Sequence, residues 1–227
     1  MIDHPLSGQF GEEIDKFRTV LAGLGVGADD KVALISNNRV EWAVTYYAAN
    51  GLGAQIVPLY EAQTEADWRY IVEHSDAKVL VVATVSIFEV THKYIDDFDK
   101  LKTVICFDAD SHRPFSYRHL MSMVDSKALV SAWNPPPEHL SAIVYTSGST
   151  GNPKGVKLSH SNFVANLLGI AKTFGEELVR EASSKQSVCY LPWSHIFGLT
   201  CSLHTSLGSG IVLVWIYICV YVSVISL

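Results

Sequence analysis

The sequence lacks the hallmarks of several protein classes. Its 17 Lys and Arg residues are outnumbered by 23 Asp and Glu residues, giving a formal net charge of −6, so it has no basic surface of the kind that binds nucleic acid. Its four cysteines form no CxxC pair and match no zinc spacing, which favours free thiols over a disulfide framework. The start, MIDHPLSGQF, lacks the basic and apolar regions of a secretory signal.

The last part of the chain lacks charge. Residues 186–227 contain no Asp, Glu, Lys or Arg, and the chain is almost continuously apolar from Ile211 to Leu227. That apolar run is at the lower edge of the roughly 17–25 residues that a helix needs to cross a bilayer.

Apolar segments with strand character alternate with segments of helical periodicity along most of the chain. This alternation predicts an α/β fold with layered, mostly parallel sheets and flanking helices. Strands are predicted at 31–36, 54–60, 78–83, 102–108, 141–146, 155–160 and 187–192, and helices at 9–24, 39–50, 64–74, 86–98, 163–174 and 195–207.

Two local features divide this pattern. The run NPPPEH (134–139) breaks regular structure and is the best boundary within the chain, because prolines continue neither a helix nor a central strand. Ser161 is a candidate N-cap for the helix that follows.

The segment YTSGSTGNPKGVKLSH (145–160) carries the composition of a polyphosphate cradle. Glycines allow the backbone to approach a ligand closely, and successive backbone N–H groups in such a turn suit phosphate oxygens. Hydroxyl groups add donors, and Lys154 adds a positive charge. A solvated Ser/Gly turn between two strands is the simpler alternative.

The loop is neither of the two common phosphate-binding motifs. A Walker A loop requires Ser or Thr after its lysine, but Gly155 follows Lys154. A G-x-G-x-x-G fingerprint should open directly into a helix, and here a strand is predicted instead.

The same loop resembles the signature of the adenylate-forming superfamily, [YF]-T-S-G-[ST]-T-G-x-P-K-G-V, without a break from Tyr145 to Val156. Residues 32–60 resemble the N-terminal region of long-chain acyl-CoA synthetases. YLPWSHIFGLT (190–200) resembles the L-P-x-x-H-x-x-G segment beside the acyl pocket of this superfamily. The resemblance covers roughly residues 9–212.

The resemblance implies a long-chain fatty acid–CoA ligase. Such an enzyme uses ATP and Mg²⁺ to convert a fatty acid into an acyl-adenylate and then transfers the acyl group to coenzyme A. The expected partners are therefore a fatty acid, ATP and coenzyme A.

The resemblance also implies site residues. His195 matches a histidine beside the acyl and adenylate site, although a hydrogen-bonded histidine at a helix start is an equal alternative. Trp193 is a candidate for lining the pocket. The residues that would hold the phosphates are Thr146, Ser147, Gly148, Ser149, Thr150, Gly151 and Lys154, and Thr146 would also ligate magnesium.

Later elements of the superfamily have no counterpart in the sequence. The segments with the magnesium-binding glutamate and the ribose-binding aspartate are absent, as is the C-terminal lid domain with its lysine. We therefore expect residues 1–214 to form an incomplete N-terminal domain of the adenylate-forming fold, with 215–227 as an atypical tail. We also expect the chain by itself to have little ligase activity.

The tail leaves alternatives open. It could be a buried strand, a membrane anchor or the product of a shifted frame, and the abrupt end of the resemblance favours the last. The expected location is cytoplasmic, or membrane-associated on the cytosolic face. Two other functions remain: a different adenylate-forming ligase that activates amino acids or short-chain acids, and a non-enzymatic, membrane-associated product.

Overall fold

A computed structural model describes residues 5–146, 151–179, 186–209 and 212–215. Its centre is a six-stranded sheet of order β4-β3-β1-β2-β5-β6, in which only the β5–β6 pair is antiparallel. The strands are β1 (Lys31–Ile35), β2 (Gln55–Leu59), β3 (Ala77–Val82), β4 (Thr103–Cys106), β5 (Leu140–Thr146) and β6 (Lys154–Ser159). Two further strands, β7 (Gln186–Cys189) and β8 (Val212–Trp215), form a separate parallel pair.

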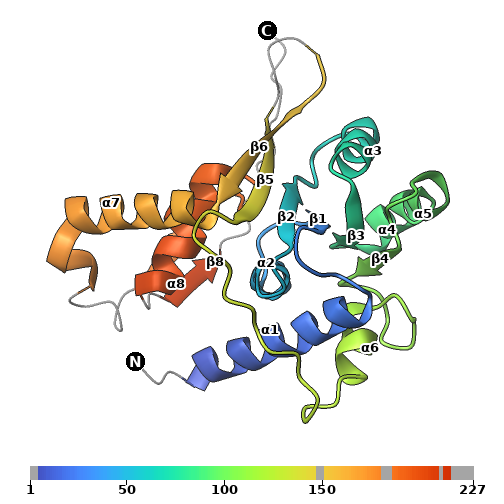
Figure 1. Ribbon diagram of the computed structural model, residues 1–227, viewed down its shortest axis with the longest axis horizontal. Helices are drawn as coiled ribbons and strands as arrows, with labels where there is room; N and C mark the ends of the chain where they lie inside the picture. Colours follow the sequence, from blue (N-terminus) through green and yellow to red (C-terminus); the bar gives the residue numbers. More distant parts are fainter. Residues whose placement is uncertain (1–4, 147–150, 180–185, 210–211, 216–227) are drawn as a thin grey trace, which may run out of the picture.

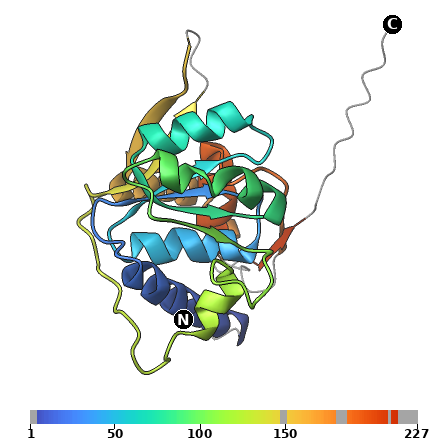
Figure 2. The same ribbon diagram turned by 90° about the vertical axis from the view of Figure 1, so that its right-hand side faces the viewer.

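Helices cover both faces of the large sheet (Figures 1 and 2). One face carries α1 (Pro5–Gly23), α2 (Val40–Asn50) and α6 (Tyr117–Ser122), and the other carries α3 (Glu65–His74), α4 (Val85–Thr91) and α5 (Tyr94–Asp97). The chain then continues through α7 (His160–Val179), a π-helix η2 (Gly198–His204) and α8 (Thr205–Ser209).

Two apolar clusters form the core, one on each face of the sheet. Successive residues of a strand point to opposite faces. Val32 and Leu34 of β1 therefore join the cluster under α1 and α2, whereas Ala33 and Ile35 join the cluster under α3. This double burial explains why the central strands are continuously apolar and confirms the predicted layered, mostly parallel architecture.

Two local predictions are wrong, and a third needs refinement. The helix expected over 86–98 is two short helices, α4 and α5. Residues 196–207 are helical as expected, but their middle part is the π-helix η2. Ser161 does not cap α7: its Oγ donates to Glu138, whereas Ser159 Oγ accepts from the Asn162 N–H at 3.3 Å. Ser159 precedes the first helical residue and so has the position that an N-cap requires.

The proline-rich segment does not divide the sheet. Strand β5 follows it and pairs in parallel with β2, so the same sheet contains strands from both sides of 134–139. The expected boundary is therefore a loop on one continuous sheet.

Within the described residues, no helix has the length and apolarity needed to cross a membrane. Residues 216–227, which make up nearly all of the expected tail, lie outside the described part of the chain.

Candidate functional site

The motif that resembles a phosphate-binding signature spans the β5–β6 hairpin. Strand β5 ends at Thr146 and β6 begins at Lys154, and these two residues are directly opposed in the antiparallel pair. Gly151 adopts a positive φ of 104°, a conformation that side-chain-bearing residues rarely adopt. The expected phosphate ligands Ser147, Gly148, Ser149 and Thr150 lie outside the described residues.

The two ends of this loop present their side chains on the same side of the sheet. Directly opposed residues of an antiparallel pair have Cβ atoms about 4.5–5.5 Å apart on one face, so Thr146 and Lys154 are neighbours. Tyr145 points to the opposite face, where its hydroxyl lies 2.7 Å from Nδ1 of His74 on α3. Both Thr146 and Lys154 are exposed, as ligands of a dissolved nucleotide must be.

His195 lies in the segment between β7 and η2, and this segment is anchored to the edge of the sheet where the parallel strands end. Ser194, only 2% exposed, donates its hydroxyl hydrogen to the backbone oxygen of Leu59, the last residue of β2, at 2.9 Å. Strand β2 is the direct neighbour of β5, and adjacent strands lie about 4.8 Å apart. Thr146 and the His195 segment therefore meet at the same edge of the sheet.

The ring of His195 is exposed, and within the described part of the chain a backbone N–H contacts its Nδ1. Its Nδ1 accepts a hydrogen bond from the Phe197 backbone N–H at 3.2 Å, and its backbone oxygen accepts one from the Leu199 N–H at 2.9 Å. The histidine thus lies just before a helix and is hydrogen-bonded there, as the alternative interpretation predicts, and its Nε2 is directed away from this backbone contact. The two interpretations of His195 are compatible.

Trp193, expected to line a pocket, is a core residue in this structure. It is 1% exposed, its ring lies 5.4 Å from that of Trp42, and its indole N–H donates to the Cys189 sulfur at 3.1 Å. Its contacts fix the segment that carries His195 against α2.

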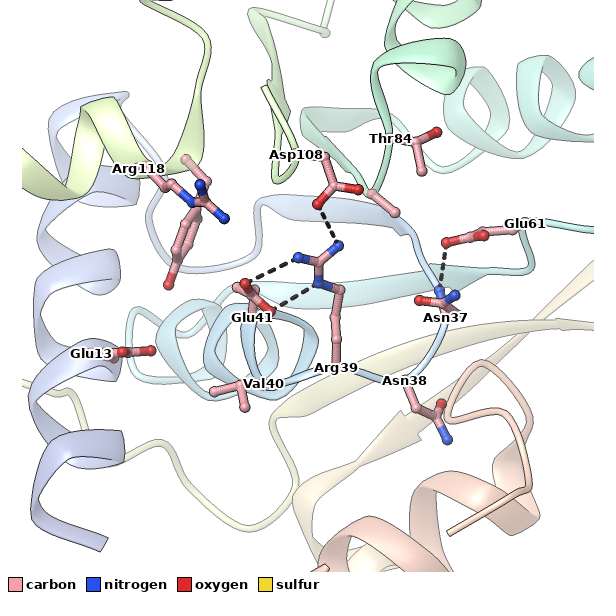
Figure 3. A pocket seen from close by; sticks show the side chains of 12 residues that line it. Glu13, Asn37, Asn38, Arg39, Val40, Glu41, Glu61, Thr84, Asp108 and Arg118 are labelled. Carbon is pink, nitrogen blue, oxygen red and sulfur yellow. Dashed lines mark hydrogen bonds and ion pairs between the residues drawn. The ribbon is translucent and has the colours of Figure 1, made fainter. Parts of the chain in front are cut away.

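A cavity of about 760 Å³ opens where β1, β3 and β4 end (Figure 3). Arg39 lies at its centre and bonds to Glu41 with two nitrogens, at 2.9 and 3.1 Å, and to Asp108 at 3.0 Å. Burial acts to lower the pKa of Arg39, but its hydrogen bonds to Glu41 and Asp108 outweigh burial and raise it. Burial acts to raise the pKa of Glu41, but the hydrogen bond and charge of Arg39, together with a backbone hydrogen bond and the charge of Arg118, outweigh burial and lower it.

These ion pairs engage Arg39 at the centre of the cavity and leave one net negative charge among Arg39, Glu41 and Asp108. Arg39 is paired with both carboxylates, and no group of three or more His, Cys, Asp or Glu side chains that could hold a metal occurs among the described residues. Sequence reasoning missed this cluster because Arg39 and Asp108 are 69 positions apart. Both residues follow strands of the predicted parallel sheet, and parallel strands end at the same edge. This shared position is the only sequence signal that could have linked them.

Comparisons with known proteins identify a matching family and related proteins. The AMP-binding enzyme family matches residues 8–217. The long chain acyl-CoA synthetase 7, peroxisomal, of Arabidopsis thaliana is 28% identical over 206 residues, which cover 83% of this chain. The chain spans 28% of the length of that relative.

Solved structures share the fold at lower identity. The anthranilate CoA ligase AuaEII in complex with anthranoyl-AMP superposes with a TM-score of 0.79 at 20% identity, over 92% of this chain and 39% of that one. ATP-bound MatB from Rhodopseudomonas palustris gives a TM-score of 0.77 at 22% identity, again over 92% of this chain and 39% of that one.

Proposed function

Because the chain belongs to the AMP-binding enzyme family, we propose that it supplies the phosphate-binding part of a long-chain fatty acid–CoA ligase. In this proposal ATP and a fatty acid react to give an acyl-adenylate and pyrophosphate, and the acyl group then passes to coenzyme A. The unbroken match of Tyr145–Val156 to the signature, on a hairpin that ends at the ligand-accessible edge of the sheet, is the observation that carries it.

The chemistry of the reaction accounts for the residue types in the hairpin. Attack of a carboxylate on the α-phosphorus builds charge on phosphate oxygens, and this charge must be met by fixed donors and cations. Lys154 would provide a positive charge for the β- and γ-phosphates, with the hydroxyls and amides of 147–151 as donors. The antiparallel pairing of Thr146 with Lys154 would keep the two ends of the cradle at a fixed separation.

Magnesium fits this arrangement as an ion bound mainly to ATP. Mg²⁺ prefers oxygen ligands and is usually held by few protein groups together with substrate phosphates. The exposed hydroxyl of Thr146 is a suitable oxygen ligand beside the phosphates. Bound magnesium would neutralise phosphate charge, while Thr146 orients the ion and Lys154 contacts phosphate oxygens.

The relative from Arabidopsis thaliana is named as a long chain acyl-CoA synthetase, and this supports fatty acids as the substrates in the proposal. The complex of AuaEII with anthranoyl-AMP provides a specific reason to keep a second candidate, the activation of a different carboxylic acid. Both candidates require the same phosphate cradle and differ only in the acid.

Replacement of Lys154 by alanine tests the cradle. We expect Lys154→Ala to weaken ATP binding by about 10- to 150-fold, since a charge-assisted contact to phosphate contributes about 1.5–3 kcal/mol. Lys157→Ala is the matched control, because Lys157 lies on the same strand, is equally exposed and projects from the other face. Isothermal titration with Mg-ATP measures both, and equal affinities for the two variants would contradict the proposal.

Stable acyl-adenylate analogues distinguish the acids without requiring turnover. We expect a palmitoyl-adenylate analogue to displace ATP at lower concentration than the acetyl, anthraniloyl or aminoacyl analogues. A preference for one of the other three would transfer the assignment to the second candidate.

A further inference from the structure

Asn38, just after β1, forms hydrogen bonds with residues that are far away in the sequence. Its side-chain oxygen accepts a hydrogen bond from the Trp193 backbone N–H at 2.8 Å, and its Nδ2 donates to the Leu191 backbone oxygen at 2.8 Å. The same nitrogen lies 3.4 Å from the Cys189 sulfur, at the end of β7. These partners are 151–155 positions away in the sequence.

The partners determine the orientation of this amide. Leu191 offers an oxygen and Trp193 offers an N–H, so a flipped amide would place like groups together. Asn38 thus pairs with the backbone of 191–193 as a neighbouring strand would. In Figure 3 its side chain points away from the ion pairs of Arg39 and toward the orange ribbon of the later segment.

The segment held by Asn38 is the one that carries His195. Asn38 fixes its start to the end of β1, Ser194 fixes its middle to the end of β2, and His195 follows directly. The one amide of Asn38 bonds to the backbone of both Leu191 and Trp193, so it holds both sides of Pro192 at once. The place of the His195 ring at the edge of the sheet therefore depends on the Asn38 amide.

The local geometry also determines which nitrogen of His195 is free. Because the Phe197 N–H donates to Nδ1, the neutral ring carries its proton on Nε2. His195 is exposed, so this Nε2–H is available to an oxygen atom of a ligand. A carboxylate needs no general base at neutral pH, since its ordinary pKa is about 4.

We propose that Asn38 is a positioning residue that holds His195 so that its Nε2–H donates to an oxygen of the bound carboxylate or acyl-adenylate. This inference rests on the proposed function and goes beyond it by assigning a role to Asn38 and a donating nitrogen to His195. His195 acts in it as a hydrogen-bond donor through Nε2.

The test uses the full chain labelled with ¹⁵N- and ¹³C-histidine, with the His195 signals assigned from their loss in His195→Gln. We expect Asn38→Ala to shift or broaden the His195 ring signals and to weaken binding of the palmitoyl-adenylate analogue about tenfold. ATP affinity should remain within about twofold, since the phosphate ligands lie on the β5–β6 hairpin. Asn38→Asp keeps the acceptor for Trp193 but places a carboxylate oxygen against the Leu191 oxygen, so it should weaken analogue binding at least as much.

Asn166→Asp is the matched control. Asn166 is exposed on α7, where its side chain donates to the Asn162 backbone oxygen of the same helix at 2.9 Å, so both His195 and analogue binding should be unaffected. Long-range ¹H–¹⁵N spectra should show the parent His195 protonated on Nε2, and a proton on Nδ1 would overturn the inference.

The possible failures are distinguishable. If Asn38→Ala binds the analogue as the parent does, or leaves the His195 signals unchanged, the role of Asn38 is overturned and the proposed function stands. If ATP and the analogue weaken equally, Asn38 acts on the fold as a whole and the positioning role is overturned. If the parent binds neither ATP nor the analogue, the proposed function fails first and this inference fails with it.

Discussion

His204, in the π-helix η2, is a titratable side chain buried in the core. It is 8% exposed, its Nδ1 lies 2.8 Å from the Tyr47 hydroxyl, and its ring contacts those of Tyr46 and Phe163. Its Nε2 has no hydrogen-bond partner within the described structure. Burial, with a smaller contribution from His160, lowers the pKa of His204 to about 4.

This low pKa predicts that acid destabilises the chain through His204. The unfolded chain takes up a proton near pH 6.5, whereas the folded chain resists protonation down to about pH 4. The unfolded state therefore binds more protons in this window, so the free energy of unfolding rises with pH between about 4 and 6.5. At 1.36 kcal/mol per unit of pKa, the contribution is at most about 3 kcal/mol.

Urea denaturation at several pH values measures this effect. His204→Gln should flatten the dependence of the unfolding free energy on pH within the window. His112→Gln, at an exposed histidine in a turn, should leave that dependence as in the parent. If the parent and His204→Gln show the same slope, His204 is not the group responsible.

At the scale of elements, the helices and strands were predicted most accurately where the burial of apolar side chains determines them. The helix expected over 64–74 is α3, whose Trp68, Ile71 and Val72 are spaced to share one face and are all buried. The strands were recognised because their side chains are buried on both faces. The π-helix could not be recognised, because one extra residue per turn leaves the apolar pattern of residues 195–207 nearly unchanged.

Gly198, the first residue of η2, lies in close contact with the backbone of Pro192. A Cβ atom added there would lie 2.2 Å from the backbone oxygen of Pro192, so a side chain cannot be accommodated without movement of the backbone. The helix therefore packs directly on the turn that precedes His195.

We predict that Gly198→Ala lowers the free energy of unfolding by about 1–3 kcal/mol, the usual cost of overpacking a core. Gly169→Ala is the matched control, since Gly169 lies within α7 and a Cβ atom added there would have no neighbour within 4 Å. That control should raise the unfolding free energy by about 0.5–1 kcal/mol, because alanine favours the helix. Chemical denaturation measures both, and a neutral Gly198→Ala would contradict the close contact.

At the scale of the whole molecule, the parts of the site that are contiguous in sequence were predictable and the rest were not. The hairpin from Tyr145 to Val156 is recognisable from composition and motif because all its groups lie within one turn. Asn38 and Arg39 bond to residues far away in the chain, and these pairings depend on how the strands are ordered in the sheet. Strand order is a tertiary property that periodicity does not encode.

The layered architecture predicts an uneven distribution of stability. Strand β1 lies between β2 and β3 with residues Val32–Ile35 fully buried, whereas β6 follows β5 at one side of the sheet with Lys154–Lys157 exposed. Backbone hydrogen bonds with few buried contacts around them open more often. The hairpin that carries the proposed phosphate ligands should therefore open without unfolding of the central strands.

Hydrogen exchange measures this difference directly. After correction for intrinsic rates, the β6 amides that bond to β5 should exchange about 100-fold faster than those of β1, which corresponds to about 2.8 kcal/mol at 1.4 kcal/mol per tenfold. Mg-ATP should slow exchange in β5 and β6 and leave α3 unchanged, because ligand binding stabilises the structure that it contacts. Equal protection of β1 and β6 would show that the hairpin and the central strands open together, and the chain would then be one cooperative unit.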